Sequence, residues 1–285
     1  MGIRPEMATI GNNELHLWCT TIHGFSRQDE LHFLSVLSHE ERRRHAHFAF
    51  QHHRDAFLTT RILARSVLAR YTRTTPEQLR FRTGPYGKPR LRSPMGIGFN
   101  LSNSSSMVVC LVGMNHMIGV DCEPFSRAEE ILELSQEFLT GPELEEVFSL
   151  HPEKQAERAL ALWTLKESYL KALGVGLTET PMNFAFLYGT GPVPRLHCKS
   201  LFKGNARNWQ FIALEHDRHR ISIAMPSSSP ARLSILETDL YANTPSMISG
   251  RLMPFDADTT VATGFTTALK HAITALMPKG TGIAG

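Results

Sequence analysis

A short segment that ends at Pro124 constrains this chain more than any other. In Ile118-Gly-Val-Asp-Cys-Glu123, apolar residues alternate with glycine or acidic residues, the period-two pattern of a half-buried strand. Asp121 and Glu123 therefore share one face, roughly 6 to 7 Å apart along the strand. Two carboxylates this close repel each other unless a cation lies between them, and all-oxygen ligation suits Mg²⁺, Mn²⁺ or Ca²⁺ better than Zn²⁺. The segment predicts a metal-binding strand; the alternative is a solvated strand edge.

A helix expected over Arg158 to Gly174 carries the second informative pattern. Apolar residues from Leu162 to Ala172 recur at spacings of three and four, which predicts a core-facing stripe. Glu167 and Lys171 fall on the other side, stacked one turn apart. Taken alone they could be an ordinary surface ion pair, worth about 0.2–0.5 kcal/mol.

Four motifs resemble, in order, those of the Sfp-type phosphopantetheinyl transferases. They are Gly87-Lys-Pro89, Phe99-Asn-Leu-Ser-Asn-Ser104, Gly119-Val-Asp-Cys-Glu123 and Trp163-Thr-Leu-Lys-Glu-Ser-Tyr-Leu-Lys171. Upstream, Arg54-Asp-Ala-Phe-Leu-Thr-Thr-Arg-Ile-Leu-Ala-Arg65 is similar to the arginine-rich first helix of that family. The resemblance covers roughly residues 14 to 240.

The resemblance implies an α+β fold of two similar halves related by a pseudo-twofold axis, each a small antiparallel sheet with packed helices. We expect residues 1–124 to form the first half and residues 125–241 the second, with the active site in the cleft between them. Residues 242–285 lie largely beyond the resemblance, and we expect a partly disordered extension with one helix over Gly264 to Met277.

Local patterns predict the elements of these halves. Strands are expected at Leu15 to Cys19, Gly98 to Leu101, Met107 to Val112, Met117 to Cys122, Asn183 to Tyr188, Trp209 to Leu214, Ile221 to Met225 and Arg232 to Leu236. Helices are expected at Ser38 to Phe50, Arg54 to Tyr71, Ala128 to Phe138, Pro142 to Leu150 and Arg158 to Leu173.

The resemblance also implies a reaction. Family members transfer the 4′-phosphopantetheine arm of coenzyme A to a serine hydroxyl of an acyl or peptidyl carrier protein and release adenosine 3′,5′-bisphosphate. Asp121, Glu123 and Glu167 would hold Mg²⁺, with Mn²⁺ as a substitute, and Lys171 would contact the same phosphates. Glu143 matches a family glutamate proposed to accept the serine proton, a task that Glu167 or a metal-bound water could also perform.

Coenzyme A also carries a 3′-phosphate. The resemblance places Arg44, Arg54 and Lys88 near its phosphates, and Ser102 could donate a hydrogen bond to one of them. Asn103 departs from the family pattern, which most often has histidine there. A neutral amide gives hydrogen bonds of about half the strength of charged ones, so we expect weaker recognition of the 3′-phosphate.

Composition fits a soluble cytoplasmic enzyme. The formal net charge of +3 is too small to indicate nucleic-acid binding by itself. The four cysteines show no Cys-x-x-Cys pair, which argues against a disulfide framework or a zinc site. Residues 1–13 lack the pattern of a signal sequence, and no apolar run is long enough to span a membrane. We expect a monomer in the cytoplasm with no membrane or nucleic-acid partner.

Two other functions are compatible with the pattern. A non-catalytic homologue that binds coenzyme A or a carrier protein is permitted by Asn103, although the acidic residues and Lys171 argue against it. A metal-dependent phosphohydrolase would fit the carboxylates, but the chain has no second acidic cluster for a two-metal site.

Overall fold

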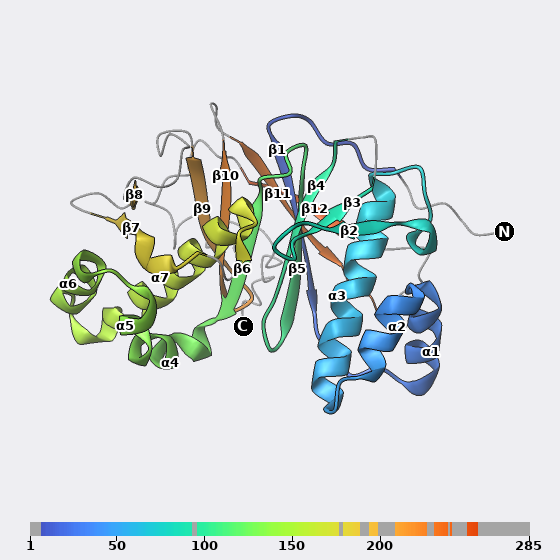
Figure 1. The fold of residues 1–285 in the computed structure, drawn as a ribbon, viewed down its shortest axis with the longest axis horizontal. Helices are drawn as coiled ribbons and strands as arrows, with labels where there is room; N and C mark the ends of the chain where they lie inside the picture. The colour runs from blue at the N-terminus through green and yellow to red at the C-terminus, as the bar shows by residue number, and fades with distance from the viewer. Residues whose placement is uncertain are drawn as a thin grey trace, which may run out of the picture.

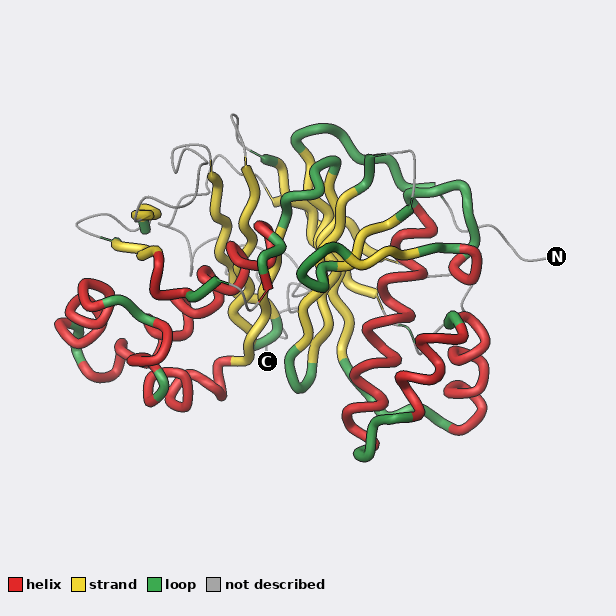
Figure 2. The backbone as a smooth tube through the Cα atoms, in the orientation of Figure 1, coloured by secondary structure: helices red, strands yellow, loops and turns green. Residues whose placement is uncertain are grey.

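The computed structural model describes residues 7–92, 96–176, 179–188, 194–198, 209–226, 231–238, 240 and 250–255. In Figures 1 and 2 two sheets lie between two groups of helices. The predicted α+β class, with helices packed on two sheets, is confirmed.

The first sheet has five strands in the order β12-β11-β1-β5-β4. Their bounds are Glu14–Thr21 (β1), Gly98–Asn103 (β4), Met107–Gly113 (β5), Arg232–Thr238 (β11) and Gly250–Phe255 (β12). All neighbours are antiparallel except β1 and β11, which run parallel with Leu17 opposite Ile235. This parallel pair departs from the antiparallel sheet we expected. The two strands lie far apart in the sequence, so the chain between them is long enough to allow parallel pairing, whereas a tight hairpin would force antiparallel pairing.

Of three helices on the outer side of this sheet, the longest lies against the strands and the other two pack on that helix (Figure 1). The three are α1 (Arg27–Val36), which the sequence analysis did not predict, α2 (His39–Ala46) and α3 (Gln51–Arg70). Trp18 of β1 packs into this helical layer together with Leu63 of α3. The short strands β2 (Phe81–Thr83) and β3 (Pro89–Leu91) form a hairpin around the segment Gly84-Pro-Tyr-Gly87.

The second sheet has three antiparallel strands in the order β6-β10-β9. Their bounds are Gly119–Pro124 (β6), Trp209–His216 (β9) and His219–Pro226 (β10). The helices of this half are α4 (Ala128–Glu133), α5 (Ser135–Phe138), α6 (Gly141–Ser149) and α7 (Pro152–Leu173), and β7 (Phe184–Leu187) pairs with β8 (Arg195–Cys198). Helix α7 packs along β6 and β10.

The two sheets share an apolar core. Leu15 and Leu17 of β1 face Val120 and Cys122 of β6, all with almost no exposed surface. Because successive residues of a strand point to opposite faces, β1 buries both faces, one against this core and one against α1–α3. Cys19, Cys110 and Cys122 are buried and free.

The chain crosses between the sheets. Strand β6 lies within residues 1–124 but pairs with β10, while β11 returns to pair with β1 of the first half. The proposed boundary near residue 124 therefore falls where the chain leaves β6 for the helices of the second half. Domain limits at 124 and 241 stay a prediction.

Several predicted elements have different bounds in the structure. Helix α7 begins at Pro152, six residues before the expected Arg158, because proline suits the first helical position. It ends at Leu173 and is capped by Gly174, whose φ of 68° is left-handed. The helix predicted over Ala128 to Phe138 is split into α4 and α5. Within residues 242–285, where only loop and a late helix were expected, Gly250–Phe255 forms the edge strand β12. The helix predicted at Gly264 to Met277 lies outside the described residues.

No helix in the described part of the chain combines the length and the apolar character needed to cross a membrane.

Candidate active site

Gly119 allows β6 to pack directly on α7. A Cβ atom at this position would lie 2.0 Å from the carbonyl oxygen of Ser168 and 2.4 Å from the amide nitrogen of Ala172. Both are backbone atoms, so a larger residue would force the strand away from the helix. The close approach places the acidic residues of β6 beside the polar residues of α7.

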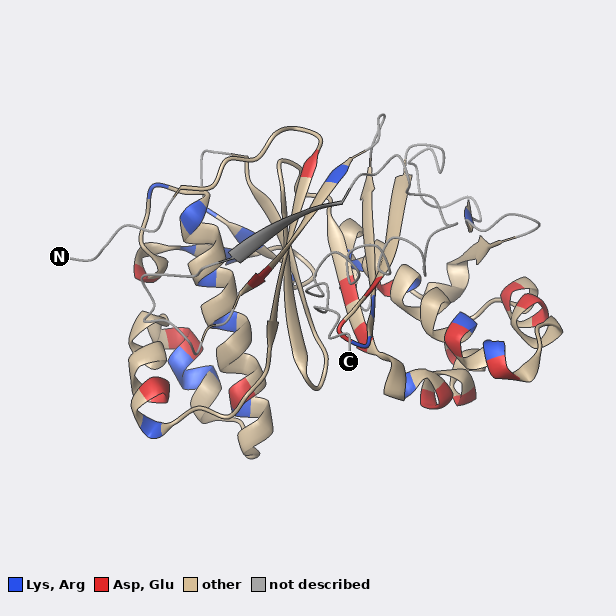
Figure 3. Ribbon diagram, turned by 180° about the vertical axis from the view of Figure 1, so that it is seen from behind, with Lys and Arg blue, Asp and Glu red and all other residues tan. Residues whose placement is uncertain are grey.

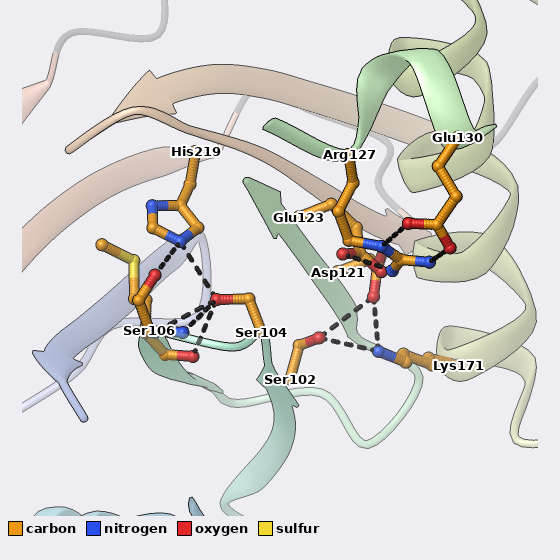
Figure 4. Close-up of polar contacts among 10 residues, drawn as sticks. Ser102, Ser104, Ser106, Asp121, Glu123, Arg127, Glu130, Lys171 and His219 are labelled. Atoms are coloured by element: carbon orange, nitrogen blue, oxygen red, sulfur yellow. Dashed lines mark hydrogen bonds and ion pairs between the residues drawn. The ribbon is translucent and has the colours of Figure 1, made fainter. Parts of the chain in front are cut away.

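Asp121, Lys171 and Ser102 form the centre of this site (Figure 4). The Lys171 ammonium donates to Oδ1 of Asp121 at 2.6 Å and to Oγ of Ser102 at 2.9 Å. The Ser102 hydroxyl in turn donates to the same Asp121 oxygen at 3.0 Å. The other Asp121 oxygen, Oδ2, is buried and has no hydrogen-bond partner among the described residues.

Two side chains of β4 join the sheets at this site. Asn100 accepts a hydrogen bond from the Val120 amide of β6 at 2.8 Å, and Ser102 reaches Asp121. Since Asn100 and Ser102 are two residues apart, they project from the same face of β4. The Phe99-Asn-Leu-Ser segment thus links the first sheet to the acidic strand of the second.

Glu123 lies on the same side of β6 and pairs with Arg127. The guanidinium of Arg127 donates to Glu123 at 2.8 Å and also binds Glu130 (Figure 4). Burial, followed by the negative charge of Asp121, raises the pKa of Glu123 despite this partner. The repulsion between Asp121 and Glu123 that the sequence predicts is therefore present.

Glu167 completes the acidic group from α7. Burial raises the pKa of Glu167 most, and the charge of Asp121 raises it further, while Lys171 acts in the opposite direction. Glu167, Lys171, Asp121 and Glu123 therefore form one electrostatically coupled group in the structure.

The donor set partly fits a divalent cation. Carboxylate oxygens are the ligands that Mg²⁺ prefers, and the buried, unpartnered Oδ2 of Asp121 is the atom that a cation would satisfy. In the arrangement seen, however, Lys171 and Arg127 neutralise Asp121 and Glu123. No three His, Cys, Asp or Glu side chains of the described residues converge into a metal-binding cluster. The three-carboxylate metal site therefore stays a prediction.

Glu143 lies elsewhere. Its side chain is fully buried beside the Lys166 ammonium, 2.8 Å away. One of its oxygens accepts from the amide and hydroxyl of Thr140, and the other accepts from the Phe186 amide. A carboxylate so enclosed holds α6 and β7 against α7, and no substrate hydroxyl can reach it without unpacking. The structure therefore opposes its predicted role as proton acceptor.

Lys88 also has a different environment from the one expected. Its ammonium donates to three carbonyl oxygens, those of His116 at 3.1 Å, Ile118 at 2.8 Å and Ala172 at 3.0 Å. Burial, with a smaller contribution from Arg90, lowers the pKa of Lys88 to about 8. All three ammonium hydrogens have acceptors, so Lys88 joins the start of β6 to the end of α7 and has none left for a phosphate.

The remaining predicted nucleotide contacts are dispersed. Arg44 lies over the Phe57 ring, and Arg54 donates to the Phe48 carbonyl oxygen at 2.7 Å. Both belong to the outer helices of the first half, where α3 carries arginines at positions 54, 61, 65 and 70 (Figure 3). Asn103 is exposed at the end of β4, one residue after Ser102. The structure brings Ser102 to the acidic group but does not join Arg44 or Arg54 to it by any contact of the described residues.

Sequence reasoning missed two residues of this region. Arg127 follows Glu123 by four positions, a spacing that could have indicated the ion pair. Lys166 precedes Glu167 in the helical motif, but its burial beside Glu143 had no local signal.

Comparison with known proteins agrees with these motifs. Residues 117–224 match the 4′-phosphopantetheinyl transferase superfamily, and residues 25–115 match the N-terminal region of 4′-phosphopantetheinyl transferases. The chain is 32% identical over 180 residues to 4′-phosphopantetheinyl transferase HetI of a Nostoc species, covering 62% of this chain and 75% of HetI. It is 29% identical over 153 residues to 4′-phosphopantetheinyl transferase Sfp of Bacillus subtilis, covering 54% of this chain and 67% of Sfp. The chain therefore belongs to the 4′-phosphopantetheinyl transferase superfamily and is an enzyme of that type.

Proposed function

We propose that this enzyme transfers the 4′-phosphopantetheine arm of coenzyme A to a serine hydroxyl of an acyl or peptidyl carrier protein. Membership of the superfamily supports the class of reaction. The observation that carries the proposal is the polar group of Asp121, Lys171 and Ser102, with Glu123 and Glu167 coupled to it.

The reaction is a phosphoryl transfer. The serine oxygen forms a bond to the phosphorus that carries the pantetheine arm, and the bond from that phosphorus to the bridging diphosphate oxygen breaks. Adenosine 3′,5′-bisphosphate leaves with the bonding electrons, and the serine proton passes to a base. Such transfers depend mainly on positioning and on neutralising the charge of the phosphates.

Asp121, Glu123 and Glu167 are the residues that would hold Mg²⁺ in this proposal. The ion would supply positive charge to the diphosphate oxygens. The unpartnered Oδ2 of Asp121 and the raised pKa values of both glutamates support the assignment, because each reports a negative charge that lacks full compensation.

Lys171 and Glu167 have tasks that follow from their places. The Lys171 ammonium carries positive charge at the centre of the group, where a phosphate oxygen could share it with Asp121. Glu167 is only half-buried, so a serine hydroxyl of the carrier could approach it, which the enclosed Glu143 does not allow. We assign proton acceptance to Glu167 in place of the enclosed Glu143.

Release of adenosine 3′,5′-bisphosphate tests the proposal. The enzyme is incubated with coenzyme A and Mg²⁺, with or without an apo-carrier protein, and the nucleotide product is measured by chromatography. We expect release that requires both the carrier and Mg²⁺. Release at the same rate without a carrier would instead indicate a phosphohydrolase.

A further inference from the structure

A buried histidine joins two hairpin turns beside the candidate active site (Figure 4). His219 begins β10 and has only 4% of its surface exposed. Its Nε2 lies 3.0 Å from Oγ of Ser104 and 3.1 Å from Oγ of Ser106, both in the turn between β4 and β5. Its Nδ1 lies 2.6 Å from the carbonyl oxygen of Asp217, in the turn between β9 and β10.

These contacts fix the proton on the ring. A carbonyl oxygen can only accept, so Nδ1 carries a hydrogen that it donates to Asp217. In the neutral ring Nε2 is then an acceptor, and a serine hydroxyl must donate to it. Ser104 Oγ also accepts from the Met107 amide at 3.0 Å and the Ser106 amide at 3.3 Å, so the histidine bond closes a network around the β4–β5 turn.

The turn on the other side of the ring is strained. Asp217 and Arg218 both have left-handed φ values, 41° and 61°, which non-glycine residues rarely adopt. The Asp217 carbonyl is held by His219, and the Arg218 carbonyl accepts from the Phe125 amide at 3.0 Å. The surrounding structure therefore holds the β9–β10 turn in place. His219 connects this turn to the β4–β5 turn, which carries Ser104 and Ser106.

The β4–β5 turn, which holds Ser104 and Ser106, continues directly from β4, the strand that carries Ser102. Ser104 is two residues from Ser102, whose hydroxyl binds both Lys171 and Asp121. Asn103, the predicted contact of the 3′-phosphate, lies between them and is exposed. Any movement of the β4–β5 turn moves both residues.

We propose that His219 is a positioning residue that braces the β4–β5 turn, and through it Ser102 and Asn103, for binding the nucleotide of coenzyme A. The inference rests on the proposed function for its substrate. His219 acts without touching the substrate, since its ring nitrogens are used by Asp217 and the two serines.

Two substitutions of His219 distinguish the hydrogen bond at Nδ1 from the hydrogen bonds at Nε2. In His219→Asn the short amide can stand in for Nδ1 and keep the bond to Asp217, but it cannot reach the serines. In His219→Gln the longer amide can stand in for Nε2 and keep the serine bonds. The control is His216→Gln, because His216 lies directly across the same hairpin from His219 and pairs instead with Glu237 at 3.1 Å.

Affinity for coenzyme A is measured by calorimetry, and kcat and both KM values by transfer to a carrier. We expect His219→Asn to raise the Kd and the KM for coenzyme A about three- to tenfold, the effect of one or two lost hydrogen bonds. The carrier KM should stay within about twofold, and His219→Gln should restore much of the affinity. A merely structural residue would lower the melting temperature without this selective change.

Ser106→Ala provides a second test if His219→Asn fails to fold, because Ser106 is exposed and its loss leaves β10 intact. It should also raise the Kd for coenzyme A. Unchanged coenzyme A affinity in the folded His219→Asn variant, or in Ser106→Ala where His219→Asn does not fold, would overturn the inference.

If wild-type enzyme binds coenzyme A but transfers nothing to any carrier, the proposed function fails while the calorimetric comparison still decides the role of His219. If it does not bind coenzyme A, both fail.

Discussion

The Lys171 ammonium lies 2.6 Å from Oδ1 of Asp121, and Ser102 bonds to both. Lys171 therefore neutralises one oxygen of the aspartate and leaves Oδ2 without a partner among the described residues. In the reaction we propose, a cation at Oδ2 would share Asp121 with Lys171, and both would supply positive charge to the coenzyme A phosphates.

Glu167→Gln should stabilise the metal-free protein at neutral pH. Burial and Asp121 raise the pKa of Glu167 above its unfolded value of about 4.3, so the folded state binds more protons than the unfolded state between the two values. Stability therefore falls as pH rises through that window, and above it the folded protein carries the cost of a buried charge. In chelator at pH 7 the variant should melt a few degrees above wild type, and the difference should vanish near pH 4.

Glu145→Gln, at an exposed position within α6, is the control and should change the melting temperature little. Added Mg²⁺ should raise the melting temperature of wild type but not that of Glu167→Gln. A variant that melts below wild type at pH 7, or a difference that is the same at every pH, would contradict the placement of Glu167.

Glu143→Leu should damage stability rather than chemistry. Removing one partner of a fully buried ion pair leaves the Lys166 ammonium uncompensated, at a cost of about 3–5 kcal/mol. Adding Lys166→Met should recover part of that loss, as seen by chemical denaturation. A single variant with wild-type stability and a collapsed kcat would return Glu143 to the catalytic residues.

Lys88→Met should lower the free energy of unfolding by about 1–3 kcal/mol, because three carbonyl oxygens lose their donor. The KM for coenzyme A should change little. Lys154→Met, at an exposed position of α7, controls for loss of a charge. If the KM for coenzyme A rises sharply while stability is kept, Lys88 contacts the nucleotide after all.

Asn103→His should sharpen the preference for coenzyme A over 3′-dephospho-coenzyme A. The exposed amide offers only neutral hydrogen bonds, whereas an imidazolium adds a charge, most clearly below about pH 6.5. The measurement is kcat/KM for both donors with both proteins. An unchanged donor ratio would show that residue 103 does not recognise the 3′-phosphate.

The sequence predicts the local parts of this site well. The alternation from Ile118 to Glu123 and the stripe from Leu162 to Ala172 give β6 and α7, because each pattern lies within one element. Only the family resemblance predicted that β6 and α7 pack against each other. The structure shows why they can: Gly119 has no side chain, so the strand lies directly on the helix backbone.

Long-range contacts account for what the sequence did not predict. In the sequence, nothing distinguishes Glu143 from any glutamate in the first turn of a helix. Only the packing of α6 on α7 places the Lys166 ammonium beside it. The carbonyl oxygens that bind Lys88 come from residues up to 84 positions away. His219 is 115 positions from Ser104, so no local pattern could join them.

The intact mass of an apo-carrier protein after incubation with enzyme, coenzyme A and Mg²⁺ tests the central claim most directly. A panel of acyl and peptidyl carriers is compared with the same carriers whose acceptor serine is replaced by alanine, and with the Asp121→Asn enzyme. We predict a gain equal to one phosphopantetheine arm on at least one carrier, absent with the alanine carrier and strongly reduced with Asp121→Asn. No mass gain on any carrier, or an equal gain with Asp121→Asn, would contradict the account.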